Sequence, residues 1–501
     1  QGFAPAAVQA AVPSSSLEEA VRAQASSDRT LRHFYALRGY KPLWTDGTGI
    51  FASAERMLER LKTADADGLD PGDYQVRRLR QAFDAADSPK ALARAEILLS
   101  KNLMKYVRDL HRAPAAEMTY VDPALIPTPP TPGAALERMA QAGNGSLAPA
   151  LATHPIYEDL RAYYVQWRRG RTVKPGVRVP EGPPLKVGST GPRVQALRAR
   201  LGLDREGPFG LIDAAAVRAF QAENGIPVTG TANAQTLALL NPPASGGGDA
   251  PGDVERSLRL NLERARALPA AAERYVLVDA AAQRLWLYED GKVKDTMRVI
   301  VGRVNEPTPM LAAYIRYAAL NPYWNVPTDL VRTRVAPHVL KQGLGYLKAQ
   351  RYEILESWDE GAKTVDPKTI DWRAVVDGKV DLAMRQLPGP KNSMGNIKFM
   401  FPNQYGVYLH DTPEKKLFGS DDRSQSAGCV RLEDAPKLAR WLFGRMPSAK
   451  GGKPEQQVPL EKPVPVYITY LTAAPTENGI AFREDFYGRD GKAALSLAQR
   501  D

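Results

Sequence analysis

The spacing of apolar residues changes along the chain and divides it into helical and β parts. Between residues 16 and 170, apolar side chains recur every three or four positions, as from Leu98 to Leu110, which predicts amphipathic helices. Three shorter helical patterns, separated by glycines, follow between residues 185 and 241. From Arg274 the period falls to two, which predicts strands at 275–278, 284–288, 293–301, 311–320, 397–401, 405–410 and 464–471, with one helix at 435–443. The sequence therefore predicts a multidomain α+β protein.

Stretches rich in proline, glycine and serine mark the expected domain boundaries. We expect, in chain order, a disordered lead at 1–15, a helical scaffold domain at 16–170, a linker at 171–183, a small three-helix module at 184–242, a linker at 243–253, a mainly-β domain at 254–475 and a C-terminal tail at 476–501. Within the β domain, residues 325–384 lose the period of two and are predicted to form a helical insertion. Such an insertion is either a surface elaboration or a lid over a site, and we favour a lid.

Composition limits the possible partners. Lys and Arg outnumber Asp and Glu by 67 to 56, so the net charge of +11 suits nucleic acid, an anionic membrane surface or an anionic cell-wall polymer. No basic block interleaved with aromatic residues favours nucleic acid, and no apolar run is long enough to span a bilayer. The five histidines lack carboxylate partners at metal-ligand spacing, so we expect neither a metal nor another cofactor.

The candidate chemistry lies around the single cysteine, Cys429. Gly428 before it allows a sharp turn and a close approach of substrate to the backbone. His410 ends an alternating run in which Tyr408 and His410 share one strand face, while Asp411 points the other way. A thiol beside an imidazole supports covalent acyl transfer, and an imidazolium would make the thiol titrate below the roughly 8.5 of free cysteine. An isolated Cys and His can equally be buried, satisfied side chains.

The surrounding residues favour the catalytic interpretation. Four stretches together resemble the catalytic signature of the L,D-transpeptidases of the YkuD type, in the large YcbB-like class that remodels bacterial peptidoglycan: Phe399–Asn403, Tyr408–Pro413, Leu417–Phe418 and Ser426–Leu432. The resemblance implies that Cys429 is the nucleophile and His410 the base. Many relatives carry His or Ser where this chain has Ala427, so Ala427 is excluded as a second base.

Further site residues follow from the same resemblance. The N–H groups of Gly428 and Cys429, helped by Tyr408, are expected to stabilise the oxyanion. The expected substrate-binding residues are Trp324, Arg385, Asn403, Ser426 and Arg431. Trp324 is equally consistent with packing against the sheet. Arg431 suits either a substrate carboxylate or a salt bridge that fixes the loop.

The other two parts of the chain resemble parts of the same kind of protein. Four stretches of the small module resemble the widespread peptidoglycan-binding module, which implies wall attachment: 188–191, 194–197, 219–221 and 225–230. The Phe34-Tyr35, Pro42-Leu43-Trp44 and Asp67–Asp70 segments are similar to the helical scaffold region of the large class.

The resemblance implies a peptidoglycan L,D-transpeptidase. Cys429 would attack the L-centre carbonyl of the third stem residue and release D-alanine, and the thioester would pass to a neighbouring stem as a 3→3 cross-link. Hydrolysis by an L,D-carboxypeptidase and a non-catalytic wall-binding scaffold are the alternatives. In papain-like peptidases the Cys precedes the His, whereas here His410 lies nineteen residues before Cys429. We also expect the protein to be a target of carbapenems and to have a role in cell shape. Its expected location is the periplasm of a Gram-negative bacterium, after removal of a signal peptide.

Overall fold

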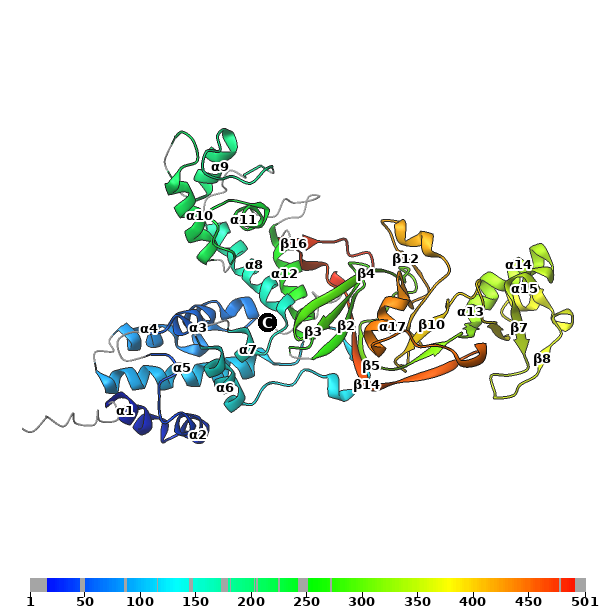
Figure 1. Ribbon diagram of the computed structural model, residues 1–501, viewed down its shortest axis with the longest axis horizontal. Helices are drawn as coiled ribbons and strands as arrows, with labels where there is room; N and C mark the ends of the chain where they lie inside the picture. The colour runs from blue at the N-terminus through cyan, green and yellow to red at the C-terminus, as the bar shows by residue number, and fades with distance from the viewer. Residues whose placement is uncertain are drawn as a thin grey trace, which may run out of the picture.

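The computed structural model describes residues 16–45, 50–84, 88–114, 116–143, 147–172, 179–180, 182–201, 203, 206–223, 226–241, 251–270, 273–476 and 479–491. The expected lead at 1–15 lies outside these residues, as does most of the two expected linkers. Figure 1 shows four bodies in the described part: an N-terminal helical body, a small module above it, a central β body and an insertion at the far end. The predicted multidomain α+β fold is confirmed.

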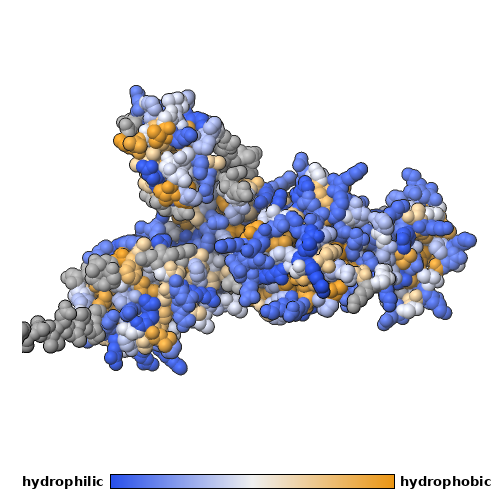
Figure 2. Space-filling model, viewed as in Figure 1, coloured by the Kyte–Doolittle hydropathy of each residue, from blue (hydrophilic) through white to orange (hydrophobic). Residues whose placement is uncertain are grey.

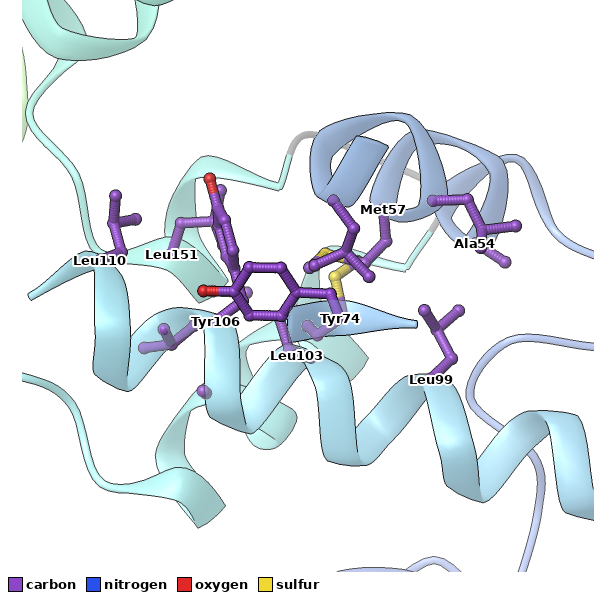
Figure 3. Close-up of a cluster of buried hydrophobic side chains, with 14 of the residues drawn as sticks. Ala54, Met57, Tyr74, Leu99, Leu103, Tyr106, Leu110 and Leu151 are labelled. Carbon is purple, nitrogen blue, oxygen red and sulfur yellow. The ribbon is translucent and has the colours of Figure 1, made fainter. Parts of the chain in front are cut away.

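The N-terminal body is built around one long helix, α5, whose apolar residues lie on faces covered by its neighbours. Figure 3 shows Leu99, Leu103, Tyr106 and Leu110 from α5 meeting Met57 and Tyr74 in the core. Burial of these side chains is the main source of stability for such helices. The helices are α1 (Ser16–Ala25), α2 (Arg29–Leu37), α3 (Ala52–Lys62), α4 (Val76–Asp84), α5 (Pro89–Leu110), α6 (Pro132–Ala142), α7 (Ala148–Leu151) and α8 (Pro155–Thr172), with 3₁₀ turns at Ala64–Asp67, Pro71–Tyr74 and Pro123–Leu125.

A buried carboxylate connects the helices of this body. Asp67 is fully buried and accepts hydrogen bonds from the hydroxyls of Tyr106 (2.5 Å) and Tyr157 (2.6 Å) and from Arg161 Nε (2.8 Å). Arg161 and Arg60 hold the pKa of Asp67 below its usual range despite burial. The sequence marks Asp67-Gly68 only as a turn, but in the structure the Asp67 side chain connects this turn to helices α5 and α8.

The small module interrupts the helical body. Its three predicted helices are present as α9 (Pro192–Leu201), α10 (Leu211–Glu223) and α11 (Ala234–Leu240), and a buried Arg198–Asp213 ion pair at 2.7 Å joins α9 to α10. The chain leaves α8 to form the module and returns through α12 (Pro251–Arg266), which packs along α8. The assignment of α12 to the β domain was wrong, because Leu258, Leu262 and Ala265 are buried in the N-terminal core.

The β body is a sheet that closes on itself. The strands are β2 (Arg274–Asp279), β3 (Arg284–Glu289), β4 (Lys292–Gly302), β5 (Leu311–Leu320), β10 (Ile397–Met400), β11 (Leu409–His410), β12 (Ser424–Ser426), β13 (Val430–Leu432) and β14 (Gln456–Thr469). Around the ring the order is β5-β10-β11-β13-β4-β3-β2-β14, and β14 pairs with β5 to close it. β12 pairs with β4 beside this ring. The predicted Asp290-Gly291 hairpin turn joins β3 to β4, with both residues in the left-handed region (φ 50° and 72°).

Both faces of part of this sheet are buried. Val276 and Val278 face the barrel core, whereas Tyr275 and Leu277 face a second cluster against the N-terminal body. A short strand from that body, β1 (Thr119–Tyr120), extends the sheet by pairing in parallel with β5. The helical and β bodies therefore share one continuous interface. The expected division of the chain, with the scaffold domain ending at residue 170, did not include such an interface. Helix α17 (Ala435–Phe443) packs Leu438 and Leu442 into the barrel core.

The insertion between β5 and β10 has its own core and its own sheet. The predicted helices are present as α13 (Thr328–Leu330), a π-helical turn at Val331–Val335, α14 (Ala336–Gln342), α15 (Gly345–Gln350), a 3₁₀ turn at Pro367–Thr369 and α16 (Trp372–Val376). A four-stranded sheet, which the sequence did not predict, accompanies them: β6 (Trp324–Val326), β7 (Tyr352–Leu355), β8 (Thr364–Val365) and β9 (Ala383–Gln386). Figure 2 shows that the surface of this insertion is mainly hydrophilic on the side in view.

Two other expectations require correction. The predicted strand at 405–410 is reduced to Leu409–His410, because Asn403 holds residues 401–407 in a turn through hydrogen bonds to the Phe401 and Val407 carbonyls. The start of the expected tail is structured: β15 (Ala473–Thr476) and β16 (Gly479–Phe482) form a hairpin, and Tyr487 packs against the barrel core.

Candidate active site

Strand register places four polar side chains on one face of the barrel wall. In the parallel pair of β11 and β13, Leu409 lies beside Val430 and His410 beside Arg431, so Tyr408 lies beside Cys429. Leu409 and Val430 are fully buried in the barrel core. Side chains alternate along a strand, so Tyr408, His410, Cys429 and Arg431 share the opposite face. The rings of Tyr408 and His410 meet edge to face at 5.9 Å.

The loop that carries Cys429 is held from two sides. Ser426 Oγ donates to the Cys429 carbonyl (2.6 Å) and accepts from the Gly428 N–H (3.2 Å). Thr308 Oγ1 donates to the Gly428 carbonyl at 2.8 Å. The backbone of Gly428 has φ +101°, a conformation that L residues rarely adopt. The loop is thus fixed by side chains on both flanks of the cysteine.

The orientation of His410 is set by backbone. Its Nδ1 lies 2.5 Å from the Asp411 carbonyl oxygen, and because a carbonyl only accepts, Nδ1 carries the proton and Nε2 keeps its lone pair. The Asp411 carboxylate points elsewhere: it accepts from the Asn396 N–H (3.0 Å) and pairs with Lys415 Nζ (2.8 Å). This agrees with the predicted opposite face for Asp411 and identifies a carbonyl as the group that orients the imidazole.

Burial keeps the thiol and the imidazole neutral. Burial, together with the nearby Arg431 and Lys398 cations, lowers the pKa of His410 to about 3. Burial raises the pKa of Cys429 to about 11, although the N–H of Tyr408 and the charge of Arg431 act in the opposite direction. A thiolate–imidazolium pair that titrates below free cysteine is therefore not the resting state that this environment favours. Burial also raises the pKa of Tyr408, which keeps its phenol protonated.

Cations surround this face. Lys398 lies beside His410 in the β10–β11 register, and its Nζ pairs with Glu455 Oε1 at 2.5 Å. Arg431 Nη1 pairs with Glu414 Oε2 at 2.5 Å, so of the two roles expected for Arg431 the structure contains the salt bridge to the loop. Both cations are paired with carboxylates, so this face is bordered by two ion pairs.

Several predicted substrate-binding residues lie outside this cluster. Trp324 packs against the insertion's own core and meets Tyr352 at 6.3 Å between ring centroids. Arg385 stacks on Tyr323 (4.3 Å) and pairs with Glu353 (2.9 Å) at the neck of the insertion. Asn403 is used by the turn before β11, and its side-chain oxygen accepts from the Tyr405 N–H at 3.0 Å.

Other parts of the predicted set are already engaged in local structure. Ser426 is 1% exposed and both of its hydroxyl bonds go to the cysteine loop. The Gly428 N–H, expected as an oxyanion donor, is used by Ser426 Oγ. In the structure these contacts give Ser426 and the Gly428 N–H a role in bracing the cysteine loop.

Sequence reasoning missed three contributors. Thr308 is fully buried and contacts the cysteine loop from 120 positions away in sequence. Lys398 is joined to His410 only through strand pairing, and the Gly406 carbonyl lies 3.8 Å from Cys429 Sγ only because of the turn before β11. Of these three contributors, only Lys398 had a usable signal in the sequence. The alternation of residues 397–401 predicts a strand, and Lys398 is a charged residue in a strand that would otherwise be apolar.

Comparison with known families agrees with this geometry. Residues 273–468 match the model of the L,D-transpeptidase catalytic domain, YkuD. These residues form an L,D-transpeptidase catalytic domain. Residues 29–163 match a scaffold domain, and residues 190–240 match a "Putative peptidoglycan binding domain". The L,D-transpeptidase domain thus accompanies the two other modules that the resemblance implied, and peptidoglycan-acting domains indicate an extracytoplasmic location.

Individual relatives are similar over part of the chain. A "Putative L,D-transpeptidase" of Haemophilus influenzae is 31% identical over 251 residues, which are 49% of this chain and 50% of the relative. The chain thus spans about half the length of that relative. An L,D-transpeptidase from Mycobacterium smegmatis is 16% identical, with 39% of this chain and 58% of that chain covered and a TM-score of 0.20. One from Xylanimonas cellulosilytica is 17% identical, with 58% and 99% covered and a TM-score of 0.17.

Two features are absent from the described ranges. They contain no group of three or more His, Cys, Asp or Glu side chains arranged to hold a metal ion. No helix in those ranges has the length and apolar character needed to cross a membrane.

Proposed function

We propose that this protein is a peptidoglycan L,D-transpeptidase that forms 3→3 cross-links through a thioester on Cys429. The observation that carries the proposal is the shared face of Tyr408, His410, Cys429 and Arg431, built by the pairing of β11 with β13. A nucleophile, a base with a free ring nitrogen, a phenol donor and a cation on one face are the parts that acyl transfer requires.

The first half-reaction uses the neutral pair. His410 Nε2 takes the thiol proton as Cys429 Sγ attacks the L-centre carbonyl of the third residue of a tetrapeptide stem. The oxyanion is held by the Cys429 N–H and the Tyr408 hydroxyl; in the described part of the chain, the structure gives that N–H no acceptor. The intermediate collapses to a thioester, and His410 returns the proton to the amine of the departing D-alanine.

The second half-reaction forms the cross-link. The side-chain amine of the third residue in a neighbouring stem attacks the thioester, His410 takes its proton, and the thiol is restored. Water in place of the amine would give an L,D-carboxypeptidase with the same thioester. The non-catalytic wall-binding scaffold is disfavoured, because a scaffold has no need for a neutral imidazole that a backbone carbonyl orients on the same strand face as the cysteine.

The insertion at 325–384 is proposed to be a substrate-capping lid. It has a separate core, and its neck reaches the site through Tyr323, whose N–H donates to Glu455 (2.7 Å), the partner of Lys398. The module at 184–242 is proposed to hold the enzyme on the wall, with the whole protein in the periplasm of a Gram-negative bacterium and with a role in cell shape.

The proposal is tested with a carbapenem, an acyl donor that reports on the first half-reaction, and with purified tetrapeptide muropeptides. Mass spectrometry of the parent is expected to give one carbapenem adduct on the Cys429 peptide and dimeric 3→3 muropeptide products. Cys429→Ala removes both. His410→Gln, which keeps the volume of the imidazole, is expected to slow acylation by about 10² to 10⁴. An adduct on any other residue, or monomeric tripeptide as the sole product, contradicts the mechanism or the cross-linking reaction respectively.

A further inference from the structure

A buried threonine far from the catalytic motif controls the peptide group before the nucleophile. Thr308 Oγ1 donates to the Gly428 carbonyl (2.8 Å) and accepts from the Gly302 N–H (2.8 Å), so its hydroxyl is used in both directions. The approach is close: a Cβ on Gly302 would lie 2.1 Å from the Glu306 carbonyl oxygen and 3.0 Å from Gly428 Cα. The loop between β4 and β5 therefore presses against the cysteine loop at a fixed position.

This hydrogen bond has a geometric consequence for the nucleophile. A trans peptide group is planar, and its C=O and N–H point in opposite directions. Anchoring the Gly428 carbonyl to Thr308 therefore directs the Cys429 N–H away from Thr308, to the other side of the cysteine loop. Because Gly428 has no side chain and a φ of +101°, its own conformational preference would not hold the peptide plane there.

Thr308 is itself held by the segment that follows the family match. Tyr487 OH donates to the Gly302 carbonyl (2.5 Å) and accepts from the Thr308 N–H (3.3 Å), and Arg489 Nη2 donates to the Thr308 carbonyl (2.8 Å). The Tyr487 ring stacks on Tyr470 at 5.1 Å, and the Arg489 guanidinium lies 4.8 Å from the Tyr487 ring centroid. Three elements distant in sequence thus meet at one threonine.

We propose that Thr308 is a positioning residue that aims the Cys429 N–H at the developing oxyanion, and that Tyr487 and Arg489 hold Thr308 for this purpose. This inference rests on the proposed thioester chemistry. The C-terminal segment, which lies beyond residues 273–468 of the family match, becomes part of the catalytic apparatus by this route. The role is indirect, since Thr308 acts through the Gly428–Cys429 peptide rather than on substrate.

The test separates a reaction that needs an oxyanion donor from one that does not. Carbapenem acylation passes through an oxyanion, whereas alkylation by iodoacetamide is a direct displacement with no such intermediate. We expect Thr308→Val, which is isosteric but lacks the hydroxyl, to slow acylation by about 10- to 100-fold, somewhat less than the loss of a whole oxyanion donor. Alkylation at the same pH is expected to stay within about twofold of the parent, and Thr308→Ser to restore acylation.

Two further variants complete the design. Thr469→Val is the matched control, because Thr469 is fully buried in β14 of the same barrel and its hydroxyl has no hydrogen-bond partner among the described residues; both reactions are expected to match the parent. Tyr487→Phe removes only the hydroxyl that holds Thr308 and Gly302, and is expected to slow acylation by a smaller factor, again with alkylation retained. If Thr308→Val does not fold, as judged by its thermal transition, Tyr487→Phe decides the question.

The outcomes are distinct. Acylation of Thr308→Val within about threefold of the parent, or an equal loss of acylation and alkylation, overturns the positioning role, since a general disturbance of the loop would slow both reactions. Failure of the parent to form an adduct on Cys429 overturns the proposed function instead.

Discussion

The raised pKa of Cys429 predicts a distinctive pH profile for its alkylation. With a pKa of about 11, about one thiol in 10⁴ is ionised at pH 7, compared with about one in thirty for a free cysteine at 8.5. The higher pKa makes each thiolate more nucleophilic, by roughly tenfold for a Brønsted slope near 0.45. The net expectation is alkylation roughly 20-fold slower at pH 7 than for a free cysteine.

Iodoacetamide is the appropriate probe because it is small and uncharged, so Arg431 and Lys398 do not steer it. Since Cys429 is the only cysteine of the chain, loss of free thiol reports on this site alone. The logarithm of the rate is expected to rise by one unit per pH unit from about pH 7 to 9.5 without a plateau. The same protein unfolded in urea supplies the control, and its profile is expected to bend near 8.5.

A plateau with a midpoint below 8.5 in the folded protein would refute the reasoning, because it would mean that an imidazolium holds Cys429 as a thiolate at neutral pH. His410→Gln sharpens the distinction. If the imidazole is neutral, this variant is expected to keep the rising profile while losing carbapenem acylation. If the pair is ionised, the same substitution would move the midpoint of alkylation upward.

Two further predictions concern acid stability and the insertion. Burial lowers the pKa of His154 to about 3; its Nδ1 accepts from the Ile156 N–H, so the folded state binds no proton there between pH 3 and 6.5 while the unfolded state does. This group is thus expected to lower the free energy of unfolding by about 1.4 kcal/mol for each pH unit below 6.5. In urea titrations, His154→Gln is expected to flatten the dependence of the unfolding free energy on pH, whereas the exposed His33→Gln is not. In the insertion, Arg385→Met removes the ion pair to the lid and is expected to raise KM for tetrapeptide several-fold with iodoacetamide reactivity unchanged, whereas the surface substitution Arg373→Met changes neither; unchanged KM in Arg385→Met would favour an idle elaboration.

The sequence by itself determined the elements and the chemistry of the nucleophile. Hydrophobic periodicity predicted the N-terminal helices, the three-helix module and most of the barrel strands, because period 3.6 and period 2 are properties of contiguous residues. The alternation of Tyr408, Leu409 and His410 also predicted which side of β11 the imidazole faces, and the register with β13 agrees.

What the sequence could not determine depends on contacts between distant segments. Local patterns do not state that α12 returns to pack on α8, that β14 closes the barrel on β5, or that the insertion folds its own sheet. Strand pairing and core packing are selected by the whole chain, where many weak contacts are satisfied together.

The same division applies inside the site. The motif named Ser426 and Asn403 as substrate contacts, but in the folded chain the Ser426 hydroxyl and the Asn403 amide bond to the loops beside Cys429 and His410. The motif contained no trace of Thr308 or Tyr487, which reach Gly428 and Gly302 only after the loop between β4 and β5 and the C-terminal segment have packed together. A short stretch of sequence thus determines which groups react, whereas burial and the surrounding tertiary contacts determine their protonation states and orientations.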